Sequence, residues 1–139
     1  MIYENNQVEL IMKTSHILIK DLKFYGFHGV YPEEQVVGTT FRVDARIDID
    51  PDMPGFESDQ LEDTLNYELL VEKLLQVGTA NKFRLIERLA DEMARAMLAF
   101  SHVRAADITV YKSVNRLTPE PQWIGVHRSL ESTDICKDA

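Results

Sequence analysis

The stretch FRVDARIDID, residues 41–50, decides the fold. Its apolar side chains stand at every odd position and its charged side chains at every even position. Because successive side chains of a β-strand point to opposite faces, this alternation predicts a strand with one face in a hydrophobic core and the other in water. The core is therefore expected on one side of a sheet.

Three further segments have the length and composition of strands. They cover residues 15–27, 107–112 and 124–130. Residues 26–40 are predicted to form a connecting loop, because glycine and proline recur in them. A second loop, residues 113–122, contains two prolines and joins the last two strands.

Two segments between the second and third strands have helical periodicity instead. The first covers residues 66–77, where Asn66 is a candidate N-cap and Gly78 is predicted to end the helix. The second covers residues 84–100 and has a broad apolar stripe. Oppositely charged residues spaced four apart are predicted to pair on its outer side: Arg88 with Glu92, and Asp91 with Arg95.

The order strand, strand, helix, helix, strand, strand predicts an α+β domain. Both helices are expected on one face of a four-stranded antiparallel sheet. Such a sheet has two open edges, which natural proteins either protect or pair with another chain. We therefore expect a homo-oligomer.

Composition limits the classes of function. The chain has 139 residues, of which 45% are hydrophobic and 27% charged, and its net charge is -8. Nucleic-acid binding requires clustered Lys and Arg, so this charge argues against it. No apolar run approaches the roughly 20 residues of a membrane span, so no membrane partner is expected. The single cysteine, Cys136, cannot form a disulfide within the chain, which fits a cytoplasmic location.

Three parts are expected along the chain. Residues 1–14 are predicted to be a flexible N-terminal extension, and Met12 opens a second plausible start within it. Residues 15–131 are predicted to form the folded domain. Residues 132–139 are predicted to be a C-terminal tail.

Lys112 is the most unusual residue on physical grounds. It shares strand parity with Ile108 and Val110, so its side chain is predicted to point toward the apolar side of the sheet. A lysine held away from water gives up its proton more readily and can act as a base near neutral pH. The alternative is a strand-end lysine whose amine reaches water.

Three acidic or aromatic residues and one histidine are weaker candidates. Glu87 lies in the first turn of the second helix, about 200° around the axis from Leu85 and off the apolar stripe. It is either a solvated carboxylate or, in a pocket, an acceptor for two parallel N–H groups of a flat heterocycle. Tyr67 could stack on such a ring or move a proton; the alternative is that it packs in an interface or in the core. Glu34 is either a catalytic acid or a carboxylate in a turn that is simply solvated. His28 is either a catalyst or a hydrogen-bonded structural residue of the loop.

No metal or cofactor is expected. The histidines lack close ligand spacing, and no cysteine accompanies them. The six glycines form neither a phosphate-binding loop nor a dinucleotide fingerprint. A Gly-x-Ser-x-Gly nucleophile motif is also missing from the sequence.

Four motifs, in this order, resemble the dihydroneopterin aldolase family. They are FYGFHGVYPEE at residues 24–34, DTLNY at 63–67, LIERLA at 85–90, and Lys112 at the end of the third strand. The resemblance covers about residues 15–131. Four motifs in the same order are far more specific than any one of them alone.

The resemblance implies the tunnelling fold, in which such domains oligomerise into a barrel. The assembly would be a tetramer or, with two stacked rings, an octamer, and the sites would lie between subunits. Such a barrel would give the open sheet edges their partners. It would also enclose Glu87 in a cleft.

The resemblance also implies how a pterin would be bound. Glu87 would anchor the amino-pyrimidinone edge, assisted by backbone groups near Ile86 and Leu65 and by the adjoining Asn66. Tyr67 would reach the site of a neighbouring subunit.

Catalysis, by the same resemblance, would rest on Lys112 as the principal acid–base group. Glu34 and a bound water would help at the substrate side chain, and Tyr67 would stack on or protonate the intermediate. The implied reaction is a metal-free retro-aldol cleavage of 7,8-dihydroneopterin, which gives 6-hydroxymethyl-7,8-dihydropterin and glycolaldehyde for folate synthesis. The C6=N5 imine of the substrate would accept the electrons.

Residues 113–121 depart from the family pattern, because their prolines are displaced from the positions usual after the lysine. Arg116 would favour a phosphorylated substrate. The strongest alternative is therefore a dihydroneopterin or dihydroneopterin triphosphate 2′-epimerase. A catalytically silent pterin-binding oligomer would require Lys112 or Glu34 to be disabled, yet both are present.

Overall fold

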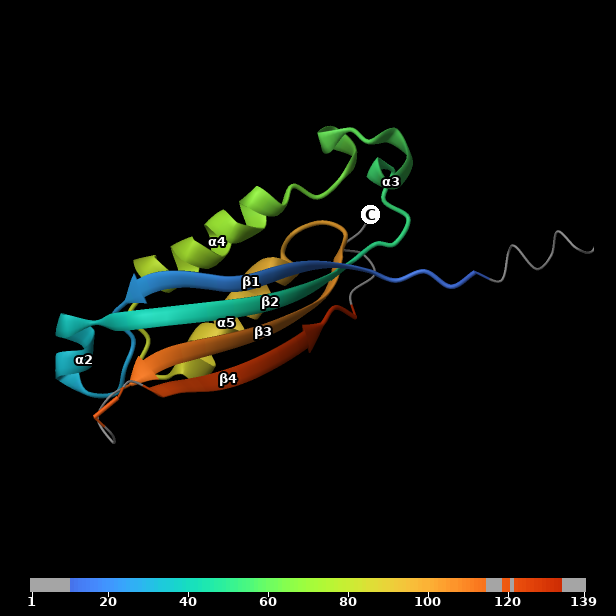
Figure 1. Cartoon of the computed structure of the whole chain (residues 1–139). Helices are drawn as coiled ribbons and strands as arrows, with labels where there is room; N and C mark the ends of the chain where they lie inside the picture. Colours follow the sequence, from blue (N-terminus) through green and yellow to red (C-terminus); the bar gives the residue numbers. More distant parts are fainter. Residues whose placement is uncertain (1–10, 115–118, 121, 134–139) are drawn as a thin grey trace, which may run out of the picture.

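The computed structural model describes residues 11–114, 119–120 and 122–133. One antiparallel sheet with the strand order β1-β2-β3-β4 forms its centre (Figure 1). The predicted extension up to residue 10, Arg116, Cys136 and the tail from residue 134 lie outside the described residues. The strands are β1 (Ser15–Gly26), β2 (Thr39–Ile49), β3 (Val103–Val114) and β4 (Gln122–Glu131).

Two long helices cover one face of the sheet, as predicted (Figure 1). Helix α4 (Tyr67–Ala80) packs on β1, and α5 (Ile86–Leu98) packs on β3 and β4. The predicted α+β class is therefore confirmed. Among the described residues, no helix is both long enough and apolar enough to cross a membrane.

The alternation in β2 appears in the structure as predicted. From Phe41 to Ile49 its odd-numbered side chains are buried beneath the helices, whereas the even-numbered ones are not. The helices contribute the opposite side of this core through Leu70, Leu74, Leu89, Met93 and Met97, all of which are fully buried.

Strand β1 contains a bulge that the sequence pattern did not reveal. The register with β2 shifts between Ile19 and Leu22, where two residues of β1, Lys20 and Asp21, lie opposite one residue of β2, Asp44. Asp21 takes a positive φ of 61°, and its backbone N–H donates to Asp44 Oδ1 at 2.7 Å. A bulge of this kind inserts one extra residue and resets which side chains face the core. The apolar positions therefore change from odd numbers to even numbers along the strand.

The predicted end of the first helix at Gly78 is wrong. Helix α4 continues to Ala80, and Gly78 is buried within it. A Cβ atom at Gly78 would lie 2.6 Å from Phe24 Cζ, so this glycine makes room for the ring. The other end of the helix is as predicted, because the Asn66 side chain accepts a hydrogen bond from Glu68 N–H at 3.0 Å.

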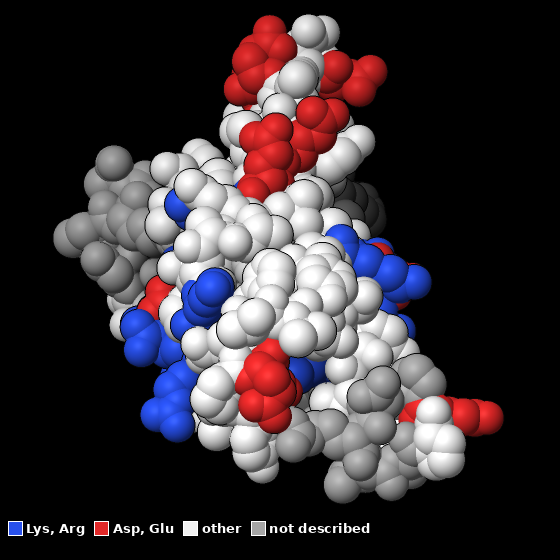
Figure 2. Space-filling view, turned by 90° about the vertical axis from the view of Figure 1, so that its left-hand side faces the viewer, with Lys and Arg blue, Asp and Glu red and all other residues white. Residues whose placement is uncertain are grey.

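Other boundaries also differ from the sequence-based expectation. The predicted loop between β1 and β2 contains the short helix α2 (Pro32–Val37), and β3 starts four residues earlier than predicted. The segment before α4 contains helix α3 (Gly55–Ser58) and the 3-10 turn η2 (Leu61–Asp63). Acidic side chains gather where this segment and the start of α4 project from the body, at the top of Figure 2.

Candidate active site

Lys112 and Glu34 form a partly buried ion pair at one end of the sheet. Lys112 Nζ donates to Glu34 Oε2 at 2.5 Å, and the two side chains are only 12% and 18% exposed. Lys112 is thus turned away from bulk water, as its strand parity predicted. Sequence reasoning did not foresee its pairing with Glu34, 78 positions away.

Helix α2 holds Glu34 in place for this contact. Pro32 stands at the start of the helix, where its fixed φ suits the first turn. The second carboxylate oxygen of Glu34, Oε1, accepts the backbone N–H of Tyr31 at 3.1 Å. The carboxylate is therefore fixed by the helix start on one side and by Lys112 on the other.

A surface hollow of about 260 Å³ brings four of the predicted site residues together. Lys112 and Glu34 form part of its wall, and Ile86 and Glu87 at the start of α5 form another part. Sequence reasoning did not single out Tyr31 and Arg84, which also contribute to the wall. Tyr31 lies in the first family motif, and this membership could have identified it as a site residue.

A second hollow of about 300 Å³ shares Glu34 and Lys112 with the first. Its wall is more polar near the sheet, where Thr39 and Ser113 lie. Thr39 Oγ1 donates to the carbonyl of Ser113 at 3.1 Å, which ties the start of β2 to the end of β3. The ion pair therefore borders two adjoining spaces.

Leu65, Asn66 and Tyr67 lie elsewhere in the same chain. They lie just before and at the start of α4. The opposite end of that helix is the one that contacts His28, through the carbonyl of Gly78. Gly78 lies eleven positions after Tyr67 along the helix, a rise of about 16 Å. Tyr67 is 63% exposed. A single chain does not bring these residues to the hollow.

His28 was considered a structural loop residue, and the structure shows that it is 1% exposed. Burial lowers the pKa of His28 below its usual 6.5, and the nearby positive charge of Lys112 lowers the pKa further, against a hydrogen bond to Gly78 that raises it. Among the described residues, no group of three or more His, Cys, Asp or Glu side chains is arranged to hold a metal ion.

Comparison with known proteins places this arrangement in a family. The family model FolB, dihydroneopterin aldolase, matches residues 17–127, a range that contains all four sequence motifs. A dihydroneopterin aldolase of Streptococcus pyogenes is 34% identical over 111 residues, which cover 79% of this chain and 92% of that protein. The chain belongs to the dihydroneopterin aldolase family.

Solved structures of dihydroneopterin aldolases share the fold. The Escherichia coli enzyme in complex with neopterin has a TM-score of 0.71 and 24% identity, with 82% of this chain and 98% of that one covered. A Burkholderia thailendensis dihydroneopterin aldolase bound to guanine has a TM-score of 0.72 and 18% identity, with 86% and 93% covered. At these identities the likeness shows that the tunnelling fold is shared.

Proposed function

We propose that the chain is a dihydroneopterin aldolase that cleaves 7,8-dihydroneopterin into 6-hydroxymethyl-7,8-dihydropterin and glycolaldehyde. The observation that carries this proposal is the Lys112–Glu34 ion pair, which borders the same hollow as Glu87 in a chain of this family. A proton-transfer pair beside a carboxylate suited to a heterocycle matches the requirements of the reaction.

Glu87 is the proposed anchor for the pterin ring. Its carboxylate is exposed at the start of α5, where it can accept two parallel N–H bonds from the 2-amino group and N3 of the ring. Backbone N–H groups in the first turn of a helix, such as that of Ile86, have no acceptor within the helix and can donate to the ring's carbonyl oxygen. Neopterin and guanine, the ligands of the two solved relatives, share this amino-pyrimidinone edge.

The Lys112–Glu34 pair is the proposed acid–base group. When the 2′-hydroxyl loses its proton to the pair, the C1′–C2′ bond breaks and glycolaldehyde leaves. The bonding electrons move into the C6=N5 imine, and N5 takes up a proton. A proton then adds to C1′ as N5 releases its own, which restores the imine in the product. Each positioned acid or base of this kind contributes about 10²–10⁴-fold.

A second copy of the chain is proposed to supply Leu65, Asn66 and Tyr67. Tyr67 is exposed and far from the hollow of its own chain, and β1 and β4 stand at the edges of the sheet. A barrel of copies would join these edges and place the tyrosine against a neighbour's Lys112. Mixing Lys112→Ala with Tyr67→Ala should then restore activity that each variant lacks, because mixed oligomers contain some intact sites. If the mixture stays inactive despite subunit exchange, the shared site is refuted.

Product analysis after incubation with 7,8-dihydroneopterin tests the reaction. Release of glycolaldehyde with the hydroxymethyl pterin supports the aldolase, and Lys112→Ala should remove more than 90% of the rate if the lysine supplies a typical acid–base contribution of about 10²-fold or more. Conversion to the 2′-epimer alone would identify an epimerase. Unchanged substrate that is nevertheless bound would identify a silent pterin-binding protein.

Epimerisation is proposed only as a side reaction of the same site. If glycolaldehyde rotates before it leaves, re-formation of the C1′–C2′ bond gives the epimer by reversal of the same proton transfers. Parallel assays with the triphosphate test whether phosphates are favoured by Arg116. Equal or lower turnover with the triphosphate would reject that idea.

A further inference from the structure

His28 is the buried polar side chain of the described core, and the proposed chemistry does not use it. Its imidazole stacks on Phe83 with ring centres 5.6 Å apart and meets the edge of Phe41 at 5.1 Å. A buried polar ring is costly unless its nitrogens are hydrogen-bonded. The partners of those nitrogens therefore show what the histidine does.

Both ring nitrogens of His28 are occupied by backbone groups. The N–H of Phe83 donates to Nδ1 at 3.0 Å, so Nδ1 carries no hydrogen. Nε2 lies 2.7 Å from the carbonyl oxygen of Gly78 and must therefore be the nitrogen that donates. Only the neutral tautomer with hydrogen on Nε2 satisfies both contacts. Its lowered pKa is consistent with a ring that stays neutral.

Phe83, the residue bound by His28, lies just before the helix that carries Glu87. Phe83 lies in the short connection between α4 and α5, three residues before Ile86 begins α5. The N–H of Gly29 donates to the carbonyl of Phe83 at 2.9 Å. Together with the bond to His28 Nδ1, this forms a two-bond clasp between residues 28–29 and Phe83.

The same two residues also support Glu34. Gly29 packs directly against the Glu34 side chain, and its carbonyl accepts from Gln35 Nε2 at 3.0 Å. Residues 28–29 therefore touch α2, which carries Glu34, and the connection that begins α5, which carries Glu87. These are the two walls of the hollow described above.

We propose that His28 is a positioning residue that sets the spacing between the ring-binding carboxylate of Glu87 and the Lys112–Glu34 pair. It acts through the bond from Phe83 N–H to Nδ1, whereas the bond to Gly78 mainly secures the end of α4. This role rests on the proposed aldolase function. A misplacement of about 1 Å between substrate and catalytic groups costs on the order of 100-fold in rate, so a single backbone link can matter.

Two substitutions separate the two bonds. In His28→Asn, the amide oxygen takes the place of Nδ1 and keeps the Phe83 link but loses the Gly78 link. In His28→Gln, the amide nitrogen takes the place of Nε2 and keeps the Gly78 link but loses the Phe83 link. Both variants remove the ring from the same aromatic surroundings, so each controls for the loss of packing in the other.

We expect His28→Gln to lower kcat about tenfold or more, and His28→Asn to retain kcat within about threefold, when both rates are expressed per folded protein. Both should lose thermal stability. If the two variants keep the same kcat, or lose it equally, then His28 is only structural and the proposal is wrong.

Two measurements do not depend on cleavage of dihydroneopterin, and the first of them needs only the wild-type protein. In the wild-type protein, ¹⁵N NMR at neutral pH should show that the His28 ring carries hydrogen on Nε2 only. A protonated ring at that pH would overturn the proposal. Hydrogen exchange at residues 83–87 should rise more in His28→Gln than in His28→Asn, and the reverse order would also overturn it. An inactive wild-type chain with these two results intact would refute the aldolase function alone.

Discussion

Gly29 and Glu34 pack so closely that a Cβ atom at Gly29 would lie 2.6 Å from Cβ, Cδ and Oε1 of Glu34. Non-bonded carbon atoms prefer separations of about 3.5–4.0 Å, so a side chain at position 29 cannot coexist with Glu34 in its present place. The missing side chain of Gly29 is what lets the Glu34 carboxylate reach Lys112.

Gly29→Ala should therefore push Glu34 away from Lys112 and lower turnover of dihydroneopterin about tenfold or more. Steady-state kinetics with the folded variant would measure this. Gly125→Ala is a matched control, since its Cβ would meet the Tyr111 ring at 2.7 Å on the opposite face of the sheet from Lys112. It should lose stability and keep its turnover. Equal turnover losses in both variants would point to general crowding instead.

Glu87→Ala should chiefly weaken binding of the pterin. A single hydrogen bond to a charged group contributes about 1.5–3 kcal/mol, so loss of the anchor should raise Kd by at least about 10–100-fold. Titration of neopterin fluorescence would measure the affinity. Glu92→Ala, five residues further along α5 and paired with Arg88 at 3.0 Å, provides the control and should bind neopterin normally. Unchanged affinity in Glu87→Ala would refute the anchoring role.

Gly78→Ala should destabilise the fold although alanine is the better helix former. The new Cβ would meet the Phe24 ring at 2.6 Å, and overpacking of this kind costs about 1–3 kcal/mol. Higher helix propensity returns at most about 1 kcal/mol. Urea unfolding would measure the difference. Thr79→Ala, at the next and exposed position, should not show the loss; a stabilised Gly78→Ala protein would contradict the packing argument.

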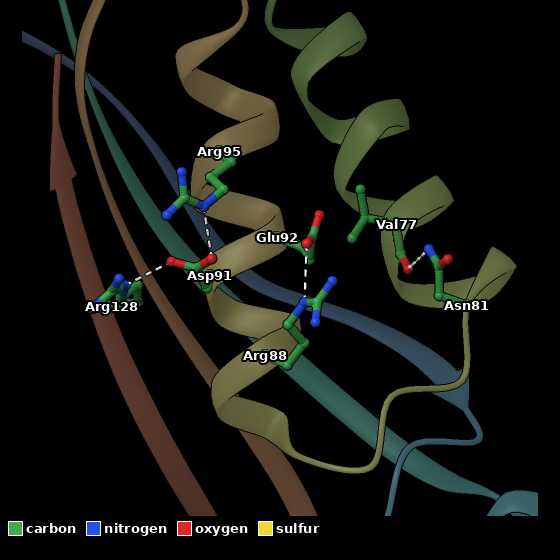
Figure 3. Close-up of polar contacts among 7 residues, drawn as sticks. All are labelled: Val77, Asn81, Arg88, Asp91, Glu92, Arg95 and Arg128. Carbon is green, nitrogen blue, oxygen red and sulfur yellow. Dashed lines mark hydrogen bonds and ion pairs between the residues drawn. The ribbon is translucent and has the colours of Figure 1, made fainter.

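Asp91 of α5 accepts a hydrogen bond from Arg128 of β4 at 2.8 Å, which joins the helix to the strand (Figure 3). It also accepts one from Arg95 within the same helix at 2.7 Å. The hydrogen bond from Arg95, with a smaller contribution from Arg128, lowers the pKa of Asp91 below its usual 3.8. A carboxyl with a lowered folded pKa stabilises the fold at pH values well above 3.8 and loses this contribution as the pH falls through the folded value. Asp91→Asn should therefore be less stable than wild type at pH 7, and the gap should shrink toward pH 3.

Urea unfolding at several pH values would follow that gap. Glu92→Gln is the control, because Glu92 pairs with Arg88 within the same helix (Figure 3). Its effect should be smaller at neutral pH. A gap for Asp91→Asn that stays constant from pH 7 to pH 3 would exclude the proposed linkage.

Local periodicity was enough to predict the four strands, the two long helices and their common face. It also predicted the inward direction of Lys112, because strand parity is a property of neighbouring residues. It failed where a residue's role depends on a contact with a distant part of the chain. Gly78 was predicted to end the helix, but it is a glycine because the Phe24 ring packs against it. The partnership of Glu34 with Lys112 likewise depends on the folded arrangement of two distant segments.

The burial of His28 could not be predicted, since it lies in a segment that reads as an exposed loop. Tyr67 presents a different problem. Its proposed role depends on a second copy of the chain, which no pattern within one chain can position. Sequence motifs identified the family, but the spacing between its site residues comes from packing contacts that have no local signature.

The bulge in β1 means that this strand contains one residue more than its pairing with β2 requires, since Lys20 and Asp21 together lie opposite the single residue Asp44. Removing a single residue there, such as Asp21, would convert the irregular stretch into regular alternation while Ile19 and Leu22 both stayed on the inner face. The same deletion elsewhere in β1 would reverse the orientation of every side chain on one side of the cut. The fold should therefore tolerate deletion of one residue of β1 at the bulge and at no other point of that strand.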